Sequence, residues 1–211
     1  MTSPQPPLAL ASGIERLQLS EALALLGDGV RAQLPEAHLH PIDYLQAIID
    51  GLCNVTLRDP LTGATNRRHL MTALEGELDR VARSGDAALL LIVDIDHFKA
   101  VNDTYGHPVG DLILQQVAQR LQASIRTYDI AARFGGEEFL VLCADTDVPT
   151  AVQVAERIRT VVAEQVFTTP QGATLRVTVS LGVQASITTP EAMMQLVEAA
   201  DQALYCAKQA G

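Results

Sequence analysis

The sequence is poor in cysteine and contains no long apolar segment. Its three cysteines, Cys53, Cys143 and Cys206, are odd in number, far apart and set in apolar surroundings. This excludes a disulfide framework and predicts buried free thiols in a reducing compartment. No apolar run reaches the ~18 residues of a membrane span, and the first ten residues lack the basic start of a secretion signal. We therefore expect a cytoplasmic protein with no membrane partner.

Basic residues are also scarce. The chain has 15 Lys and Arg against 25 Asp and Glu, a formal net charge of -10. Such a charge opposes binding to polyanions, so we expect no nucleic-acid partner. A single nucleotide remains compatible, because bound Mg²⁺ reverses the sign of the local field. With 211 residues and 48% hydrophobic content, the chain can bury one substantial core plus a small appendage.

The most informative segment is RFGGEEF at residues 133–139, where two glutamates follow a diglycine. Gly135 and Gly136 can supply the positive φ angles of a tight two-residue turn. The apolar runs on either side are predicted to be the strands of this hairpin, 130–134 and 139–143. Because neighbouring side chains on a strand point to opposite faces, Glu137 and Glu138 should serve different partners. The alternative is an ordinary solvated hairpin, since Gly-Gly turns are common.

A second acidic cluster, Asp94-Ile95-Asp96, follows the apolar run 87–93. A continuous run bounded by a Gly-Asp turn and by charges predicts a buried central strand, which places the acids at the rim of the core. Oxygen ligands from two neighbouring strands suit Mg²⁺, which otherwise binds water and substrate phosphates. The alternative is that Asp94 or Asp96 caps the next helix. That role accounts for one acid, but not for both together with the hairpin pair.

Helices and strands alternate beyond Asp59. Predicted helices cover 67–84, 109–125, 149–165 and 190–209. Besides the strand 87–93 and the hairpin, residues 174–186 predict one strand, or two strands bent at Gly182. The order βαββαβ with a leading and a closing helix is the split arrangement of ferredoxin-like folds. The predicted fold class is therefore α+β.

The region before Asp59 predicts short helices. Residues 8–34 carry leucines at helical spacing, broken at Gly27-Asp28-Gly29, which suggests one or two helices. Residues 41–57 predict an amphipathic helix that needs a partner surface. Packing on its own domain would supply that surface as well as a second subunit would.

Nine short motifs occur in the order and spacing of the GGDEF family of diguanylate cyclases. They are Asp59-Pro60-Leu61-Thr62-Gly63, Asn66-Arg67-Arg68, Asp94-Ile95-Asp96-His97-Phe98-Lys99, Asn102-Asp103, Gly106-His107, Gly110-Asp111, RFGGEEF at 133–139, Ser180-Leu181-Gly182-Val183 and ADQALYCAK at 200–208. Residues 59–211 therefore resemble the domain of this family, and we expect residues 1–58 to form an N-terminal helical or linker region that includes a candidate dimerisation helix. The resemblance implies the palm fold shared with nucleotidyl cyclases and polymerases, and the GGEEF signature belongs to the active form of the family's pattern.

The activity implied by the resemblance is condensation of two GTP into cyclic di-GMP with release of pyrophosphate, by a homodimer that needs Mg²⁺ or Mn²⁺. In the family, a helix such as 41–57 commonly joins the two subunits. Asp94, Glu138 and the Ile95 carbonyl would hold the metal. Glu137 would be the catalytic base or a further metal contact, and the sequence leaves both roles open. Asp96 is a weaker metal candidate.

Substrate contacts also follow from the resemblance. They comprise the guanine-reading pair Asn102 and Asp111, the triphosphate lysines Lys99 and Lys208, the backbone near Phe98, and His107 beside the base pocket. An amide serves the acceptor edge of guanine and a carboxylate accepts from its N1 and N2 hydrogens, which favours guanine over adenine. For His107 a structural role is an equal alternative.

The tetrapeptide Arg126-Thr127-Tyr128-Asp129 stands where the family has an inhibitory site for its product. The resemblance therefore implies that cyclic di-GMP binds Arg126 and Asp129 and inhibits the enzyme. By itself the tetrapeptide is generic, since arginine favours a last helical turn and aspartate often begins a turn.

Two other functional classes fit the same sequence. One is a catalytically silent receptor for cyclic di-GMP, although such proteins usually have a damaged signature. The other is a nucleotide-binding regulatory module that acts through its N-terminal helices. In the family, a Gly-Arg-Asn segment usually follows the position of Lys208, and its arginine can assist phosphate binding. This sequence departs from that pattern, because it ends at Gly211 without that arginine.

Overall fold

The computed structural model describes residues 17–169, 172, 174–185 and 192–210. The chain divides into two compact units, 1–58 and 59–211. Each unit is described by itself. In the described residues, none of the helices combines the length and the apolar character that crossing a membrane requires.

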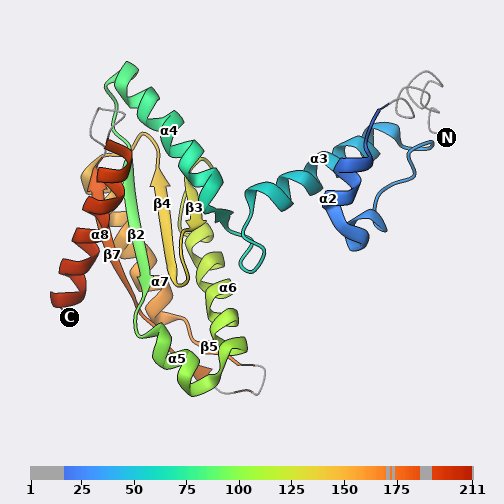
Figure 1. Cartoon of the computed structure of the whole chain (residues 1–211). Coiled ribbons are helices and arrows are strands. Elements are labelled where there is room, and N and C mark those ends of the chain that lie inside the picture. Colours follow the sequence, from blue (N-terminus) through green and yellow to red (C-terminus); the bar gives the residue numbers. More distant parts are fainter. Residues whose placement is uncertain (1–16, 170–171, 173, 186–191, 211) are drawn as a thin grey trace, which may run out of the picture. The chain divides into compact units, whose positions relative to one another are not determined.

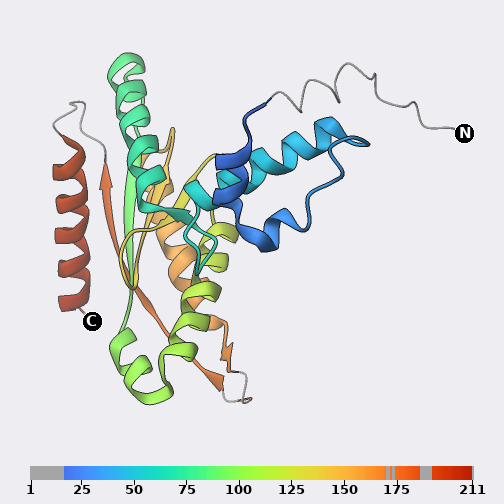
Figure 2. The same cartoon turned by 45° about the vertical axis from the view of Figure 1, so that its right-hand side comes forward.

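The N-terminal unit contains a pair of helices, α2 (Ser20–Arg31) and α3 (Pro41–Leu57), which lie side by side (Figures 1 and 2). α2 is kinked at Gly27, whose φ of 70° is non-helical, so the predicted break is confirmed; residues 8–16 lie outside the described residues. A Cβ on Gly51 would lie 2.6 Å from Leu26 Cδ2. This glycine therefore allows the close approach of the two helices.

A five-stranded sheet in the order β1-β3-β4-β2-β7 forms the centre of the second unit. Its strands are β1 (Thr65–Asn66), β2 (Leu89–Ile95), β3 (Ile130–Arg133), β4 (Glu138–Cys143) and β7 (Val179–Ala185). β1 runs parallel to β3, and the other neighbours are antiparallel. A separate two-stranded sheet pairs β5 (Phe167–Thr168) with β6 (Thr174–Leu175).

Helices cover both faces of the large sheet (Figures 1 and 2). On one face lie α4 (Arg67–Ser84) and α8 (Ala192–Ala210); on the other lie α6 (His107–Ala123) and α7 (Val148–Glu164). The short helix α5 (Phe98–Tyr105) connects β2 to α6. The order β2-α6-β3-β4-α7-β7, with α4 leading and α8 closing, confirms the predicted α+β palm fold.

β2 is buried along its whole length because the sheet separates two cores. Leu89, Leu91, Val93 and Ile95 pack with α6 and α7. Leu90 and Ile92 pack with α4 and α8. A strand covered on both faces reads as a continuous apolar run, which is why the sequence shows no alternation here. This burial fixes the strand that carries Asp94.

The strand boundaries differ from the prediction at both acidic segments. β2 ends at Ile95 rather than at 93, because pairing with β4 and β7 continues through Asp94. Within the predicted strand 174–186, the structure has two strands, β6 and β7, which are divided at 176–178 and not at Gly182; residue 186 lies outside the described residues. A Cβ on Gly182 would collide with the backbone of α8 at Leu204. Asp94 and Glu138 are therefore strand residues that face one another across the sheet.

Only one cysteine fits the predicted burial. Cys143 on β4 is buried, whereas Cys53 and Cys206 are exposed on helices, so the prediction is wrong for these two. Burial, followed by the charge of Asp129, raises the pKa of the Cys143 thiol to about 12. This thiol therefore stays protonated at neutral pH and behaves as an apolar core residue.

Candidate active site

Two carboxylates lie directly opposite each other near the end of the central sheet. Asp94 on β2 pairs in register with Glu138 on β4, and on its other side with Ser180 on β7. Like charges opposite each other on antiparallel strands repel. Asp94 is only 6% exposed, so water screens this repulsion weakly. The pair therefore requires a positive charge close to it.

Lys208 supplies one such charge from the last turn of α8. Its Nζ lies 2.7 Å from Asp94 Oδ1. That oxygen is buried and accepts no regular hydrogen bond within the described part of the chain, so the ammonium contact is an ion pair without hydrogen-bond geometry. The structure thus brings together Lys208 and the acidic pair, which the sequence places more than 60 residues apart.

Glu137 belongs to the same electrostatic cluster. Burial raises the pKa of its carboxyl, the charge of Asp94 raises it further, Lys208 lowers it, and Glu138 adds a smaller increase. Glu137 lies in the loop just before β4. The prediction that Glu137 and Glu138 are neighbours on one strand, with side chains on opposite faces, is therefore wrong for Glu137. A half-buried carboxyl with a raised pKa, next to two other acids, is suited to accepting a proton.

Gly135 acts through its small size, and neither glycine of the pair has a positive φ angle. The described glycines with positive φ are 27, 63, 85, 106 and 172, so the predicted turn conformation is wrong. Phe134 N donates to Glu138 O at 2.9 Å, which closes a three-residue loop over 135–137. A Cβ on Gly135 would lie 2.6 Å from Glu138 Oε2. Gly135 therefore leaves the room that the Glu138 carboxylate occupies.

The donors around Asp94 suit a hard divalent cation. The Asp94 carboxylate, the Ile95 carbonyl and the Glu138 carboxylate are candidate oxygen ligands, and Mg²⁺ typically takes one or two carboxylates together with water and phosphate. The buried Asp94 Oδ1, which lacks a hydrogen bond, is consistent with this use. Over the described ranges, no three His, Cys, Asp or Glu side chains form a ready-made cation site.

Arg133 holds the hairpin tip in place, a role that the sequence did not reveal. Its guanidinium donates to Gly136 O at 2.8 Å and to Asp59 Oδ1 at 3.3 Å. Burial raises the pKa of Asp59, but hydrogen bonds from Thr62 and the charge of Arg133 outweigh it, so the pKa is lowered. Asp59 therefore stays ionised and ties the hairpin to the start of the domain.

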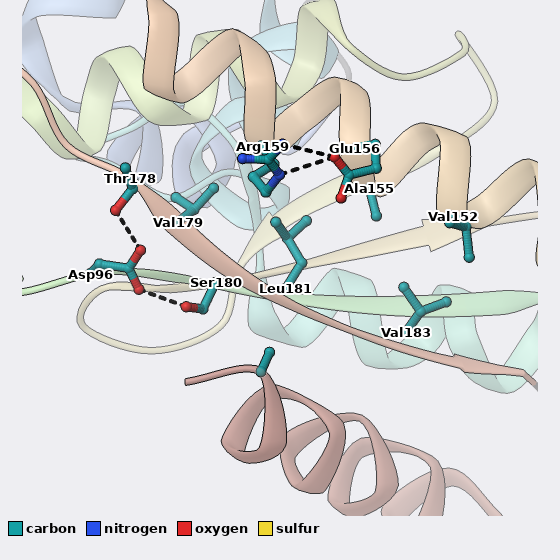
Figure 3. Close-up of a pocket in the computed structure, with 11 residues that line it drawn as sticks. Asp96, Val152, Ala155, Glu156, Arg159, Thr178, Val179, Ser180, Leu181 and Val183 are labelled. Atoms are coloured by element: carbon teal, nitrogen blue, oxygen red, sulfur yellow. Dashed lines mark hydrogen bonds and ion pairs between the residues drawn. The ribbon is translucent and has the colours of Figure 1, made fainter. Parts of the chain in front are cut away.

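Asp96 binds β7 and does not cap α5. Thr178 Oγ1 donates to Asp96 Oδ2 at 2.6 Å, and Ser180 Oγ donates to Oδ1 at 2.7 Å (Figure 3). The residue before α5 is His97, which makes no side-chain capping bond, so the capping alternative is wrong. The pocket drawn in Figure 3 is lined by Asp96 and residues of α7, β7 and α8, and by none of the three clustered acids.

The predicted base-reading residues lie where α5 meets α6. A Cβ on Gly110 would collide with Asn102 Oδ1 and would lie 3.2 Å from the Phe98 ring. Gly110 therefore sets the approach of Asn102 to α6, beside the exposed Asp111. His107 is exposed at the start of α6.

Lys99 lies in an exposed ion pair. Its Nζ is 2.9 Å from Asp103 Oδ2, one turn further along α5. Its side chain is 85% exposed, so it is free to rearrange toward a ligand.

Arg126 and Asp129 occupy the other end of the β3-β4 ladder from the acidic cluster. Asp129 Oδ2 accepts from Arg126 N at 2.9 Å, and Asp129 Oδ1 is buried without a partner in the described residues. The Arg126 guanidinium donates to Tyr128 Oη at 3.2 Å. An exposed arginine thus lies beside a carboxylate with unused acceptor capacity.

Comparison with known proteins identifies the family. Residues 56–211 match the family described as diguanylate cyclase, GGDEF domain. The response regulator PleD of Caulobacter vibrioides is 41% identical over 173 residues, 80% of this chain and 37% of that protein. The diguanylate cyclase DgcP of Pseudomonas aeruginosa is 45% identical over 155 residues, 74% of this chain and 23% of that protein. The chain thus spans less than half the length of these relatives.

Solved structures agree with this assignment. Diguanylate cyclase SiaD from Pseudomonas aeruginosa, solved in complex with its activator SiaC, is 34% identical with a TM-score of 0.72, over 96% of this chain and 79% of that one. The GGDEF domain of DgcB from Caulobacter crescentus, solved in complex with c-di-GMP, is 29% identical with a TM-score of 0.70, over 74% of this chain and 92% of that one. The chain therefore belongs to the GGDEF-domain family of diguanylate cyclases.

Proposed function

We propose that this chain condenses two GTP molecules into cyclic di-GMP and releases two pyrophosphates. Family membership supports the reaction class. The observation that carries the proposal is the pairing of Asp94 with Glu138 across β2 and β4, with Glu137 beside them. This grouping supports a shared role for Glu137 and Glu138, the two acids of the GGEEF signature, at one bound GTP.

The chemistry follows from the charges that develop during the reaction. The 3′-hydroxyl of one GTP attacks the α-phosphorus of the other, and negative charge grows on phosphate oxygens and on the leaving pyrophosphate. Asp94, Glu138 and the Ile95 carbonyl would hold Mg²⁺ or Mn²⁺, which when bound lowers the pKa of the attacking hydroxyl and neutralises phosphate charge. Glu137 accepts the hydroxyl proton at a carboxylate oxygen, and its raised pKa suits this role.

Guanine is read at the junction of α5 and α6. The Asn102 amide donates to the acceptor edge of the base, and the Asp111 carboxylate accepts from N1 and N2. Lys99, Lys208 and the backbone at Phe98 bind the triphosphate, and His107 borders the base. The conformation of Asn102 set by Gly110 supports this assignment.

Catalysis requires two copies of the chain, because one domain binds one GTP and the two nucleotides must meet. α3 offers a surface for pairing: Ile42 and Ile49 are exposed on this helix, and their spacing of seven residues places them on one side. We assign this stripe to the homodimer. The reaction belongs in the cytoplasm, where GTP is available.

Cyclic di-GMP inhibits the enzyme at Arg126 and Asp129. The Arg126 guanidinium is a planar fork for phosphate and guanine acceptors, and the Asp129 carboxylate, which accepts from Arg126 N, would accept from a guanine edge once the loop exposes it. The DgcB domain solved with c-di-GMP supports product binding in this family.

The decisive test is incubation of the chain with GTP and Mg²⁺, followed by chromatographic separation of the nucleotides. The proposal predicts cyclic di-GMP and pyrophosphate in a ratio of one to two. Binding of cyclic di-GMP without its synthesis would identify a silent receptor instead. Binding of GTP with neither product would identify a regulatory module.

A further inference from the structure

We infer that Lys208 is an internal counter-ion of Asp94, which leaves when a divalent cation binds and then contacts the triphosphate. This inference rests on the proposed function, because it assigns two successive positions to one residue of the proposed site. Binding of the cation and binding of the nucleotide are thereby coupled through a single side chain.

Asp94 carries a buried charge that calls for a counter-charge. The Asp94 side chain is 8% exposed and lies opposite Glu138. A buried carboxylate without a counter-charge or full hydrogen bonding costs several kcal/mol. In this structure the ammonium of Lys208 compensates that charge at 2.7 Å.

The fold imposes the position of Lys208 on α8. Ala200 and Leu204 of α8 are buried against the sheet. Lys208 follows them at four-residue intervals and therefore continues the same helix face. Packing of Ala200 and Leu204 against the sheet thus places Lys208, in the last turn of the helix, next to Asp94.

The Lys208 side chain is able to move. Its side chain is 41% exposed, and a lysine carries its charge on a flexible four-carbon stem. It borders an open pocket that it lines together with Asp96, His97, Thr178 and Ser180. His97 precedes α5, the helix to which we assign triphosphate contacts. A short swing of the side chain would therefore carry the ammonium from the carboxylate toward the phosphates.

Competition at Asp94 Oδ1 gives the inference its testable form. An ammonium and a divalent cation repel each other when both contact that oxygen, so Lys208 weakens cation binding when no nucleotide is present. With nucleotide bound, the same lysine adds a phosphate contact. Removing the charge of Lys208 should therefore strengthen binding of the divalent cation in the absence of nucleotide and weaken binding of GTP.

The experiment measures Mn²⁺ binding to the full chain without nucleotide, from the electron paramagnetic resonance signal of the free ion. Lys208→Met should bind Mn²⁺ about fivefold more tightly than wild type, the size expected when a half-exposed ion pair no longer competes. Lys99→Met is the matched control, because Lys99 and Lys208 are the two lysines of the chain and Lys99 pairs with Asp103. This control should bind Mn²⁺ like wild type. For GTP, both variants should bind more weakly.

Asp94→Asn separates failure of the inference from failure of the proposed site. If Asp94→Asn loses the tight Mn²⁺ site while Lys208→Met binds no more tightly than Lys99→Met, the metal site stands and the counter-ion role is overturned. If Asp94→Asn binds Mn²⁺ like wild type, the proposed site itself is overturned.

Thermal unfolding in EDTA provides a second readout. Lys208→Met should unfold at a lower temperature than wild type, because Asp94 loses its counter-charge, and added Mn²⁺ should raise its Tm by more than it raises that of wild type. Lys208→Gln should behave in the same way. Equal Tm values in EDTA for wild type and both variants would overturn the inference.

Discussion

Single side chains and their close neighbours decide what the acidic cluster can do. Asp94 and Glu138 face each other across two strands, Glu137 shares their field, and Gly135 leaves space for the Glu138 carboxylate. The effect of each residue depends on how close it lies to its neighbours. Substitutions that change the size or the charge of one side chain should therefore change metal binding or proton transfer in predictable ways.

Gly135→Ala should weaken divalent-cation binding while leaving the fold intact. The new Cβ would lie 2.6 Å from Glu138 Oε2, so the flexible carboxylate must move away, whereas the φ of Gly135 is not positive and suits alanine. We expect about tenfold weaker Mn²⁺ binding, since a displaced ligand loses much of its contribution. Gly136→Ala is the matched control, because no atom lies within 4 Å of its Cβ position. Equal binding by both variants would contradict this role for Gly135.

Glu137→Gln should reduce turnover about 100-fold or more if Glu137 is the general base. A base must be deprotonated, so the wild-type rate should fall as the pH drops through the raised pKa of Glu137. In the glutamine variant this acidic limb should disappear from the pH-rate profile. A variant profile with the limb unchanged would assign Glu137 to another role.

The raised pKa of Glu137 also has a cost for stability. The folded state holds this proton more tightly than the unfolded state, so stability is lost as the pH rises from the ordinary carboxyl range through the raised pKa. Glu137→Gln removes that loss. We expect a higher Tm than wild type at neutral pH and no difference at acidic pH, measured by calorimetry.

Whole elements show which parts of the fold the sequence can predict. The helices 67–84 and 41–57 are confirmed at both ends, because their termini carry local signals. Asn66 accepts from His69 N at 2.9 Å at the start of α4, and Gly85 has a φ of 76° at its end. Strand ends depend on partners instead: β2 extends through Asp94 because β4 and β7 continue to pair with it.

The same contrast applies to the candidate site. The sequence predicted that the two acidic segments lie on neighbouring strands, since each stands beside a clear strand, but the register that places Asp94 opposite Glu138 is seen only in the structure. It did not reveal the partners of Asp96, because Thr178 and Ser180 are 82 and 84 residues away. Nor did it reveal Arg133 bonding to Asp59, 74 residues away. Such contacts depend on which strands become neighbours, and no local pattern encodes that.

Arg120 is the clearest case of an element held by a buried charge. It is 9% exposed, donates to the carbonyls of Val162, Gln165 and Val166 at the end of α7, and lies over the Phe167 ring at 3.6 Å. Arg120→Met should lower the free energy of unfolding by about 2 kcal/mol, because these carbonyls lose a charged donor.

The control for this prediction is Arg159→Met on α7. Arg159 is exposed and pairs with Glu156 at 3.0 Å (Figure 3), and exposed pairs contribute little. Urea denaturation should therefore separate the two variants. A similar free energy of unfolding for both would show that Arg120 does not anchor α7.

At the scale of the whole molecule, the proposed reaction needs two chains to form one product. Specific activity should therefore rise with protein concentration. Ile49→Asp places a charge in the exposed stripe of α3, where Ile49 is 53% exposed, so it should weaken pairing without unfolding the helix. Analytical ultracentrifugation would report the assembly, and full activity in a verified monomer would contradict the dimer.

The central claim is that Asp94 and Glu138 form the site where two GTP molecules are joined. The most direct test measures cyclic di-GMP formed from GTP and Mg²⁺ by wild type and by Glu138→Ala at the same concentration, with circular dichroism to verify the fold. Wild type should form product, and a folded Glu138→Ala variant should form none above background, because the variant lacks one carboxylate of the pair. Equal product from both proteins would contradict this assignment.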